Sequence, residues 1–153
     1  MKKTIIIGLV FCAAGGLNAT LTTPSDPYQI TVSKSKTAQH QYKEITTQEL
    51  QEMLKNKQSP LVILDARSSE YDDGQRIPGA ILMPSDSTPK QLAAVIPSKD
   101  TPVVVYCSNL RCPASKYLAE SLVQLGYTNV MKYPEGINGW VQAGNQVIKN
   151  NKT

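Results

Sequence analysis

The sequence has few of the side chains from which metal centres and acid–base sites are usually built. Its 153 residues include three cysteines and one histidine, with only one tryptophan and one phenylalanine. A structural zinc site takes about four nitrogen or sulfur ligands, and a catalytic one takes about three. The composition therefore argues against a metal site, and we expect neither a metal nor another cofactor.

The sequence also lacks a hydrophobic run long enough to span a membrane, which takes about 20 apolar residues. Its longest apolar run, residues 5–14, follows two lysines and precedes small residues that lead to Ala19. This order is typical of a secretory signal peptide, so we expect residues 1–19 to be removed together with Cys12. The chain is then exported without a stable membrane anchor. Its destination is the periplasm if the source is a Gram-negative bacterium, and otherwise it is secreted.

Charge of one sign does not dominate the sequence. There are 16 basic and 12 acidic residues, and the lysines are scattered rather than clustered, which predicts no nucleic-acid partner. The length and the hydrophobic fraction of 41% are typical of one globular domain. We expect a flexible linker over residues 20–43, where His40 has no role, a folded domain over residues 44–145, and a polar tail over residues 146–153.

Within the expected domain, short apolar runs alternate with segments of helical periodicity. This alternation predicts an α/β fold with a mostly parallel sheet covered by helices. Continuous apolar runs predict buried strands, and apolar residues spaced three and four apart predict helices. The expected strands cover residues 61–64, 103–106 and 130–133, and the expected helices cover residues 47–56, 90–96 and 113–125. Residues 136–144 are expected to form a last helix or a turn.

Cys107 directly follows the second strong strand and precedes a loop and a helix. Functional groups in α/β sheets gather at the carboxyl ends of strands, where the next helix presents free N–H groups. We expect the loop amides, the helix beginning at Pro113 and Arg111 to lower the pKa of the Cys107 thiol. Position alone also fits a buried and unreactive cysteine.

Several motifs spaced along the chain add to this interpretation. They are Asp65-Ala66-Arg67, Ile77-Pro78-Gly79-Ala80, Val103 to Cys107, Leu125 to Val130, and Glu135 to Trp140. Together and in this order they resemble the motifs of rhodanese-like domains, over nearly the whole expected domain. The resemblance implies a three-layer α/β domain with a five-stranded, mostly parallel sheet, and a cysteine that carries sulfane sulfur as a persulfide.

The resemblance implies a sulfurtransferase of the thiosulfate:cyanide type. The Cys107 thiolate attacks a small sulfur-containing anion such as thiosulfate and passes the sulfur to a thiol, a protein or another thiophilic acceptor. The loop after Cys107 is expected to bind the substrate. It comprises Ser108, Asn109, Leu110, Arg111, Cys112 and Ser115, of which Arg111 and the backbone amides contact the anion. Asp65 and Arg67 are expected to pair and to hold the loops around this site.

The loop departs from the usual family pattern, in which an arginine stands at the position of Cys112 or, in relatives that act on phosphate or arsenate, of Pro113. Because arginine suits oxyanions, its absence there argues against phosphatase activity. We identify the chain as an exported subtype with a Cys-x4-Cys loop. In an oxidising compartment Cys112 either resolves the Cys107 persulfide or forms a disulfide with Cys107. The alternatives are thus a dithiol–disulfide oxidoreductase and a non-catalytic binding module.

Overall fold

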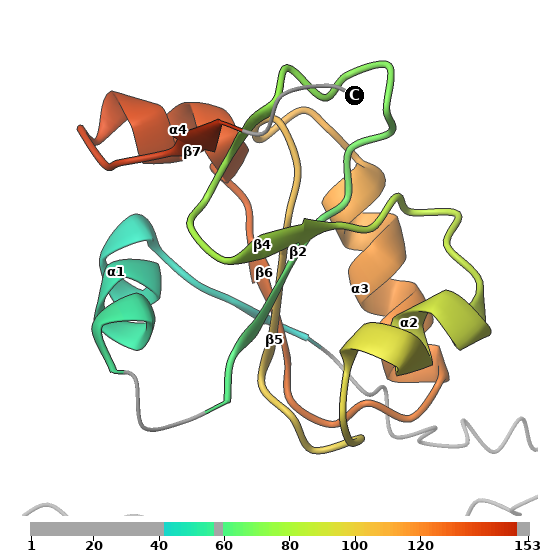
Figure 1. Cartoon of the computed structure of the whole chain (residues 1–153). Helices are drawn as coiled ribbons and strands as arrows, with labels where there is room; N and C mark the ends of the chain where they lie inside the picture. The colour runs from blue at the N-terminus through green and yellow to red at the C-terminus, as the bar shows by residue number, and fades with distance from the viewer. Residues whose placement is uncertain (1–41, 57–59, 150–153) are drawn as a thin grey trace, which may run out of the picture. The chain divides into compact units, whose positions relative to one another are not determined.

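The structure is a computed structural model that describes residues 42–56 and 60–149. Its central sheet has five strands in the order β1-β6-β5-β2-β4, and each neighbouring pair is parallel (Figure 1). The strands are β1 (Lys43–Glu44), β2 (Val62–Asp65), β4 (Ala80–Leu82), β5 (Val103–Tyr106) and β6 (Val130–Tyr133). The α/β class and the five-stranded sheet are confirmed. The expected signal peptide and most of the expected linker lie outside the described residues.

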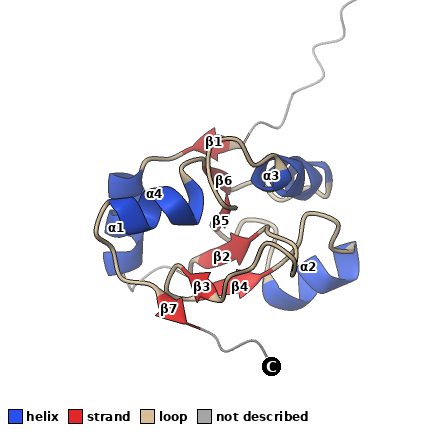
Figure 2. Cartoon of the chain, turned by 90° about the horizontal axis from the view of Figure 1, so that it is seen from above, coloured by secondary structure: helices blue, strands red, loops and turns tan. Residues whose placement is uncertain are grey.

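Helices cover both faces of the sheet (Figure 2). They are α1 (Thr47–Lys55) and α4 (Gly136–Gln142) on one face, and α2 (Pro89–Val95) and α3 (Ala114–Gln124) on the other. Side chains of a strand point alternately to the two faces. Val103 and Val105 of β5 accordingly lie in a core cluster with Leu118, whereas Val104 and Tyr106 lie in a second cluster with Ile137. The residues just after β5 therefore sit between two packed layers.

The helix starts follow from local sequence. Thr46 and Glu49 form a reciprocal capping box at α1, and Thr88 and Gln91 form another at α2, whose first residue is Pro89. The start of α3 differs, because Pro113 precedes it and no side-chain oxygen caps its first turn. The first N–H groups of α3 are thus left for other acceptors near the end of β5.

Two further strands form a small antiparallel sheet outside the central one. β3 (Gln75–Arg76) pairs with β7 (Ile148–Lys149), so residues 148 and 149 form a strand where the sequence suggested only a polar tail. Both β7 side chains are exposed, and a two-residue strand held by backbone pairing leaves no hydrophobic periodicity to detect. Within the described part of the chain, no helix has the length and apolarity needed to cross a membrane.

Candidate active site

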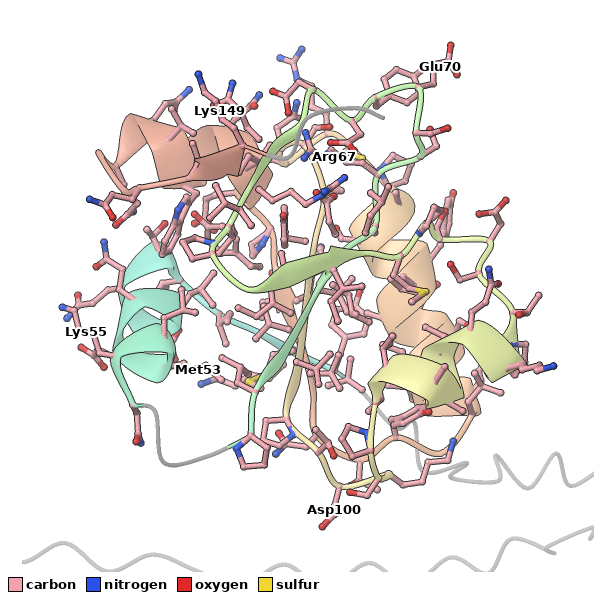
Figure 3. All side chains as sticks on the ribbon, viewed as in Figure 1. Met53, Lys55, Arg67, Glu70, Asp100 and Lys149 are labelled. Carbon is pink, nitrogen blue, oxygen red and sulfur yellow. The ribbon has the colours of Figure 1, made fainter. Side chains whose placement is uncertain are left out.

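The site forms where β2 and β5 end side by side. The two strands are parallel and pair Asp65 with Tyr106, and the Ala66 N–H donates to the Tyr106 carbonyl at 2.8 Å. Cys107 and Arg67, which follow these strands, therefore emerge at the same edge of the sheet. Figure 3 shows Arg67 at this edge, with Asp100, which precedes β5, at the opposite edge. The sequence prediction that these residues share one end of the sheet is consistent with the structure.

Arg67 is buried with all of its hydrogen-bond donors occupied. A guanidinium has five N–H groups. They donate to both carboxylate oxygens of Asp65, to Asp73 Oδ1, and to the backbone carbonyls of Tyr71 and Gln75, at 2.6–3.4 Å. Burial, the largest single cause, lowers the pKa of Arg67, but the hydrogen bonds to Asp65 and Asp73 and the charge of Asp65 together outweigh it and raise that pKa above its usual value. Arg67 thus supplies positive charge and rigidity rather than a free donor for a substrate anion.

Three residues that had no predicted role complete this charged cluster, namely Asp72, Arg76 and Tyr106. The Tyr106 hydroxyl donates to Asp65 Oδ2 at 3.0 Å and accepts from the Ile77 N–H at 3.3 Å. Arg76 pairs with Asp72, and its Nε lies 3.8 Å from Asp65 Oδ2. A tyrosine on a fully buried strand needs a partner for its hydroxyl, and this was the signal that could have identified Tyr106.

The Cys107 thiol is buried against two carbonyl oxygens, and its burial raises its pKa. Its side chain has no exposed surface, and its Sγ lies 3.2 Å from the Cys112 carbonyl oxygen and 3.8 Å from that of Asn109. Burial and a hydrogen bond with Cys112 raise its pKa, although the hydroxyl of Ser115, 3.4 Å away, opposes this. The expectation that the loop lowers the pKa of Cys107 is therefore wrong, because burial and the neighbouring Cys112 outweigh the hydroxyl and the N–H of Ser115, which lower it.

Cys112 has the environment that the sequence predicted for Cys107. Its partial burial raises the pKa of the thiol, but hydrogen bonds from Cys107 and from the N–H groups of Ser108 and Ala114, with the charge of Arg67, lower it below its usual value. Its sulfur thereby acts as an acceptor for the uncapped start of α3. The surroundings of the loop thus lower the pKa of the Cys112 thiol and raise that of the Cys107 thiol.

A pocket of about 490 Å³ opens beside the loop. It is lined by Ala66, Arg67, Ser68, Tyr71, Ser85, Ser108, Asn109, Arg111, Cys112, Pro113 and Ala114. Cys107 is not among the lining residues, and Ser115 is buried beside it. Arg111 is exposed, and its N–H donates to Asn109 Oδ1 at 2.9 Å, whereas Leu110 is 74% exposed and lies outside this pocket. The structure brings together all the predicted loop residues, but it presents only one of the two thiols to the pocket.

The start of α4 holds the loop from the other side. The Ile137 N–H donates to the Cys107 carbonyl at 2.9 Å, and the Asn138 N–H donates to the Ser108 carbonyl at 3.0 Å. Gly136 has a φ of +62°, and a Cβ there would meet the backbone of residues 107–109. The glycine therefore permits a contact that fixes the position of the loop.

Both cysteines are free thiols in the structure. Among the residues that the structure describes, no three His, Cys, Asp or Glu side chains are grouped so that they could hold a metal ion. What the site offers chemically is two free thiols in one loop, with Cys107 Sγ 3.2 Å from the Cys112 carbonyl oxygen, beside a pocket lined by Arg67 and Arg111.

Comparison with solved structures shows the same fold in several proteins. A Bacillus halodurans protein is 23% identical, with a TM-score of 0.63 over 70% of this chain and 77% of its own. A rhodanese-related protein of Thermoplasma volcanium is 24% identical, with a TM-score of 0.57 over 70% of this chain and 98% of its own.

A thiosulfate sulfurtransferase from Pseudomonas aeruginosa is 28% identical, with a TM-score of 0.62 over 75% of this chain. The matched part is 22% of that enzyme's length, so the present chain corresponds to a fraction of it. No curated protein sequence matches the chain. The sequence model of the rhodanese-like domain matches residues 46–143, which include nearly all of the central sheet and the whole two-cysteine loop. The chain belongs to the rhodanese-like domain family.

Proposed function

We propose that the chain is a sulfurtransferase that takes sulfane sulfur from a small anion such as thiosulfate and delivers it to a thiophilic acceptor through a cysteine persulfide. The observation that carries this proposal is the pair of thiols at the carboxyl edge of the sheet, beside a pocket lined by two arginines. Loop N–H groups and positive charge stabilise a thiolate and its persulfide as they would an oxyanion.

The family position of the sulfur carrier is Cys107. Its thiolate attacks the outer sulfur of thiosulfate, sulfite leaves with the bonding electron pair, and the resulting persulfide passes its outer sulfur to the acceptor. Arg111, which is exposed beside the pocket, and the N–H groups of the loop contact the anion. Because Cys107 is buried in this conformation, a persulfide on its sulfur requires the loop to open.

A second candidate function is dithiol–disulfide oxidation and reduction. It is favoured by the contact of Cys107 Sγ with the Cys112 carbonyl oxygen at 3.2 Å, which places the two free thiols side by side in one loop. Export behind the signal sequence of residues 1–19, also proposed, would put this pair in an oxidising compartment where a reductant must maintain the thiols. The protein's partners would then be a sulfur donor and a thiol or protein reductant.

Thiosulfate:cyanide sulfurtransferase activity tests the proposed function. The reduced wild-type chain is expected to form thiocyanate and to hold cyanide-labile sulfur after incubation with thiosulfate. The double variant Cys107→Ser/Cys112→Ser is expected to do neither. If the reduced wild type neither forms thiocyanate nor ever holds cyanide-labile sulfur, the sulfurtransferase proposal fails. Cycling of the pair between dithiol and disulfide without sulfur uptake would support the second function.

A further inference from the structure

A second pocket adjoins the one that Cys112 lines. Its volume is about 370 Å³, which is within the range of small-molecule sites. It is lined by Asn109, Leu110, Arg111, Glu135, Asn138, Gly139 and Gln142. Asn109 and Arg111 line both pockets, so the two meet along the loop after β5. The donor anion occupies the first pocket in the proposed function, and the second pocket is left for another ligand.

One wall of the second pocket is a single face of α4. Glu135 directly precedes the helix, and the spacing of three and then four residues places Asn138 and Gln142 on the same face. A Cβ on Gly139 would collide with the Cβ of Glu135, so the glycine leaves room for the glutamate side chain. The two amide side chains are exposed and can both donate and accept hydrogen bonds. This wall therefore offers a carboxylate and two amides to a ligand.

The Glu135 carboxylate has an unused hydrogen-bonding capacity. Its Oε2 is buried, and no residue that the structure describes donates a hydrogen bond to it. It does not cap α4, because the N–H groups of Ile137 and Asn138 donate to the carbonyls of Cys107 and Ser108. A buried carboxylate oxygen without a donor costs free energy. Since the last torsion of a glutamate is soft, the carboxyl group can turn to meet a donor that enters the pocket.

Arg111 gives the same pocket a positive charge. Its side chain is exposed, and within the described ranges the ion pairs of arginines are those of Arg67 and Arg76. The pocket thus holds a guanidinium and a carboxylate that are not paired with each other. A ligand that carries an ammonium group and a carboxylate group on one carbon atom matches both charges. An ion of one sign is attracted by one of them and repelled by the other.

We propose, resting on the proposed sulfurtransferase function, that the second pocket binds the α-amino acid group of a small thiol, and that this thiol accepts the sulfur. The ammonium group of the acceptor contacts the Glu135 carboxylate, and its carboxylate contacts Arg111. Sulfite has left by this stage, so Arg111 is free to exchange the donor anion for the acceptor. The side-chain amides of Asn138 and Gln142 supply the remaining polar contacts.

The acceptor thiolate then attacks the outer sulfur of the persulfide on Cys107. A bond forms between these two sulfurs, the bond between the outer sulfur and the Cys107 sulfur breaks, and its electron pair remains on Cys107 as a thiolate. The acceptor leaves as a persulfide that keeps the proton of the outer sulfur. The transfer consumes no reductant, because the sulfane sulfur only changes its thiol.

Three related thiols test this assignment. L-Cysteine carries both charged groups, cysteamine lacks the carboxylate, and β-mercaptopropionate lacks the ammonium group. Sulfite release from saturating thiosulfate by the reduced full chain is measured against the concentration of each thiol, and of cyanide, which carries neither group. Each acceptor is compared between the wild type and a variant, so that differences in the reactivity of the thiols cancel.

Glu135→Gln should lower kcat/KM for L-cysteine and cysteamine by about tenfold, the loss expected for one hydrogen bond to a charged group. The values for β-mercaptopropionate and cyanide should stay within about twofold, since neither presents an ammonium group to the lost charge. Glu120→Gln is the matched control, because Glu120 is an exposed glutamate of α3 whose Oε1 lies 3.9 Å from Lys116. This variant should behave as the wild type with every acceptor.

Glutathione carries the same α-amino acid group further from its thiol. A loss of kcat/KM for glutathione in Glu135→Gln would also support the proposal, and the thiol with the larger loss identifies the acceptor. Unchanged values for both L-cysteine and glutathione, or an equal loss with all acceptors including cyanide, would overturn it and leave the sulfurtransferase function intact. If the reduced wild type releases no sulfite with any acceptor, the proposed function itself fails.

Discussion

The ends of β2 and β5 lie side by side, yet their side chains are bonded in opposite ways. After β2, Arg67 uses every N–H group, and Asp65 accepts from both Arg67 and Tyr106. After β5, the groups are two sulfurs, with weak contacts and free thiols. The end of β2 is a rigid cluster of buried charges, here called the charged frame, and the end of β5 leaves its two thiols available to react. The frame comprises Asp65, Arg67, Asp72, Asp73, Arg76 and the Tyr106 hydroxyl.

At this edge of the sheet, the residues at the end of β2 stabilise the fold, and the residues after β5 supply the reactive groups. Breaking a buried ion pair leaves an uncompensated charge, which costs far more than loss of a weak sulfur contact. Substitutions after β2 should therefore act mainly on the free energy of unfolding, and loss of the Arg67 charge should in addition raise the pKa of the Cys112 thiol. Substitutions after β5 should do the reverse, and the start of α4, which touches the loop, should affect both.

The strongest test of the frame is Asp65→Asn. It leaves the Arg67 guanidinium buried without its closest counter-charge, and we expect the free energy of unfolding to fall by about 3–5 kcal/mol in urea titrations. The double variant Asp65→Asn/Arg67→Gln should lose less than the sum of the two single variants, because the orphaned charge is gone. Additive losses would show that the pair does not act as a unit.

Gly136→Ala should disturb both regions. An alanine backbone is strained at a φ of +62°. The Cβ of the alanine would also lie 2.7 Å from Ser108 C and 2.8 Å from Asn109 N, and these backbone atoms cannot move aside as a flexible side chain can. We expect a loss of about 2–4 kcal/mol together with a changed alkylation rate of the thiols.

Gly126→Ala is the matched control for this substitution. Gly126 has a φ of +85° but nothing within 4 Å of an added Cβ, so its loss should reflect backbone strain alone, about 1–2 kcal/mol. The thiols of Gly126→Ala should react as in the wild type. If the two variants behave alike in both measurements, the contact between α4 and the loop is unimportant.

Tyr106→Phe tests the frame without changing its charge. Removing the hydroxyl leaves the buried Ile77 N–H without its acceptor, and we expect a loss of about 1–3 kcal/mol in thermal unfolding. Tyr133→Phe is the control, since its hydroxyl meets the half-buried Thr47, which water can reach. A larger loss for Tyr133→Phe would contradict the importance of the Tyr106 hydroxyl.

Ser115→Ala probes the thiol end. The Ser115 hydroxyl lies 3.4 Å from Cys107 Sγ and lowers the pKa of that thiol, so its removal should raise this pKa further. We expect the alkylation profile of Cys107 to shift to higher pH, with a stability change of only about 1 kcal/mol. Unchanged pH dependence of Cys107 alkylation would show that the hydroxyl does not act on the sulfur.

The smallest effect is expected for Asp73→Asn at the exposed rim of the frame. Burial raises the pKa of Asp73, but the hydrogen bonds from Arg67 and from the Gln75 N–H, with the charge of Arg67, together outweigh it and leave that pKa below its usual value of 3.8. A lowered pKa in the folded state adds stability above about pH 4 that is lost on acidification below it. Asp73→Asn should therefore flatten the acid limb of the stability profile slightly, by about 0.5 kcal/mol or less because Asp73 is half exposed. If the acid limb of the stability profile is unchanged, the Asp73 carboxylate does not contribute to the stability of the folded state.

Much of the fold and the location of the site could be predicted from the sequence. The valine run that leads into Cys107 marked the buried strand, and Thr88 with Pro89 marked the start of α2, because these signals are local. The position of Cys107 beside Asp65 and Arg67 followed from parallel strands ending at one edge.

The division of roles within the site could not be predicted in the same way. Whether Cys107 faces amides or carbonyls depends on the path of the loop, which packing against α4 fixes from outside. The pairing of Arg76 with Asp72 requires a loop fold that no periodicity encodes. Spacing alone placed the two cysteines together without showing which of them the pocket reaches.

The pairing of β3 with β7 has a consequence for the order in which the chain can fold. Gln75, whose carbonyl binds Arg67, belongs to β3, and its partner strand is Ile148–Lys149, among the last residues that the structure describes. While that segment is still unpaired, the loop carrying the buried charges lacks its neighbouring strand. The central strands can assemble early, whereas we expect the charged loop to gain its final protection from proteases only after Lys149 has paired with β3.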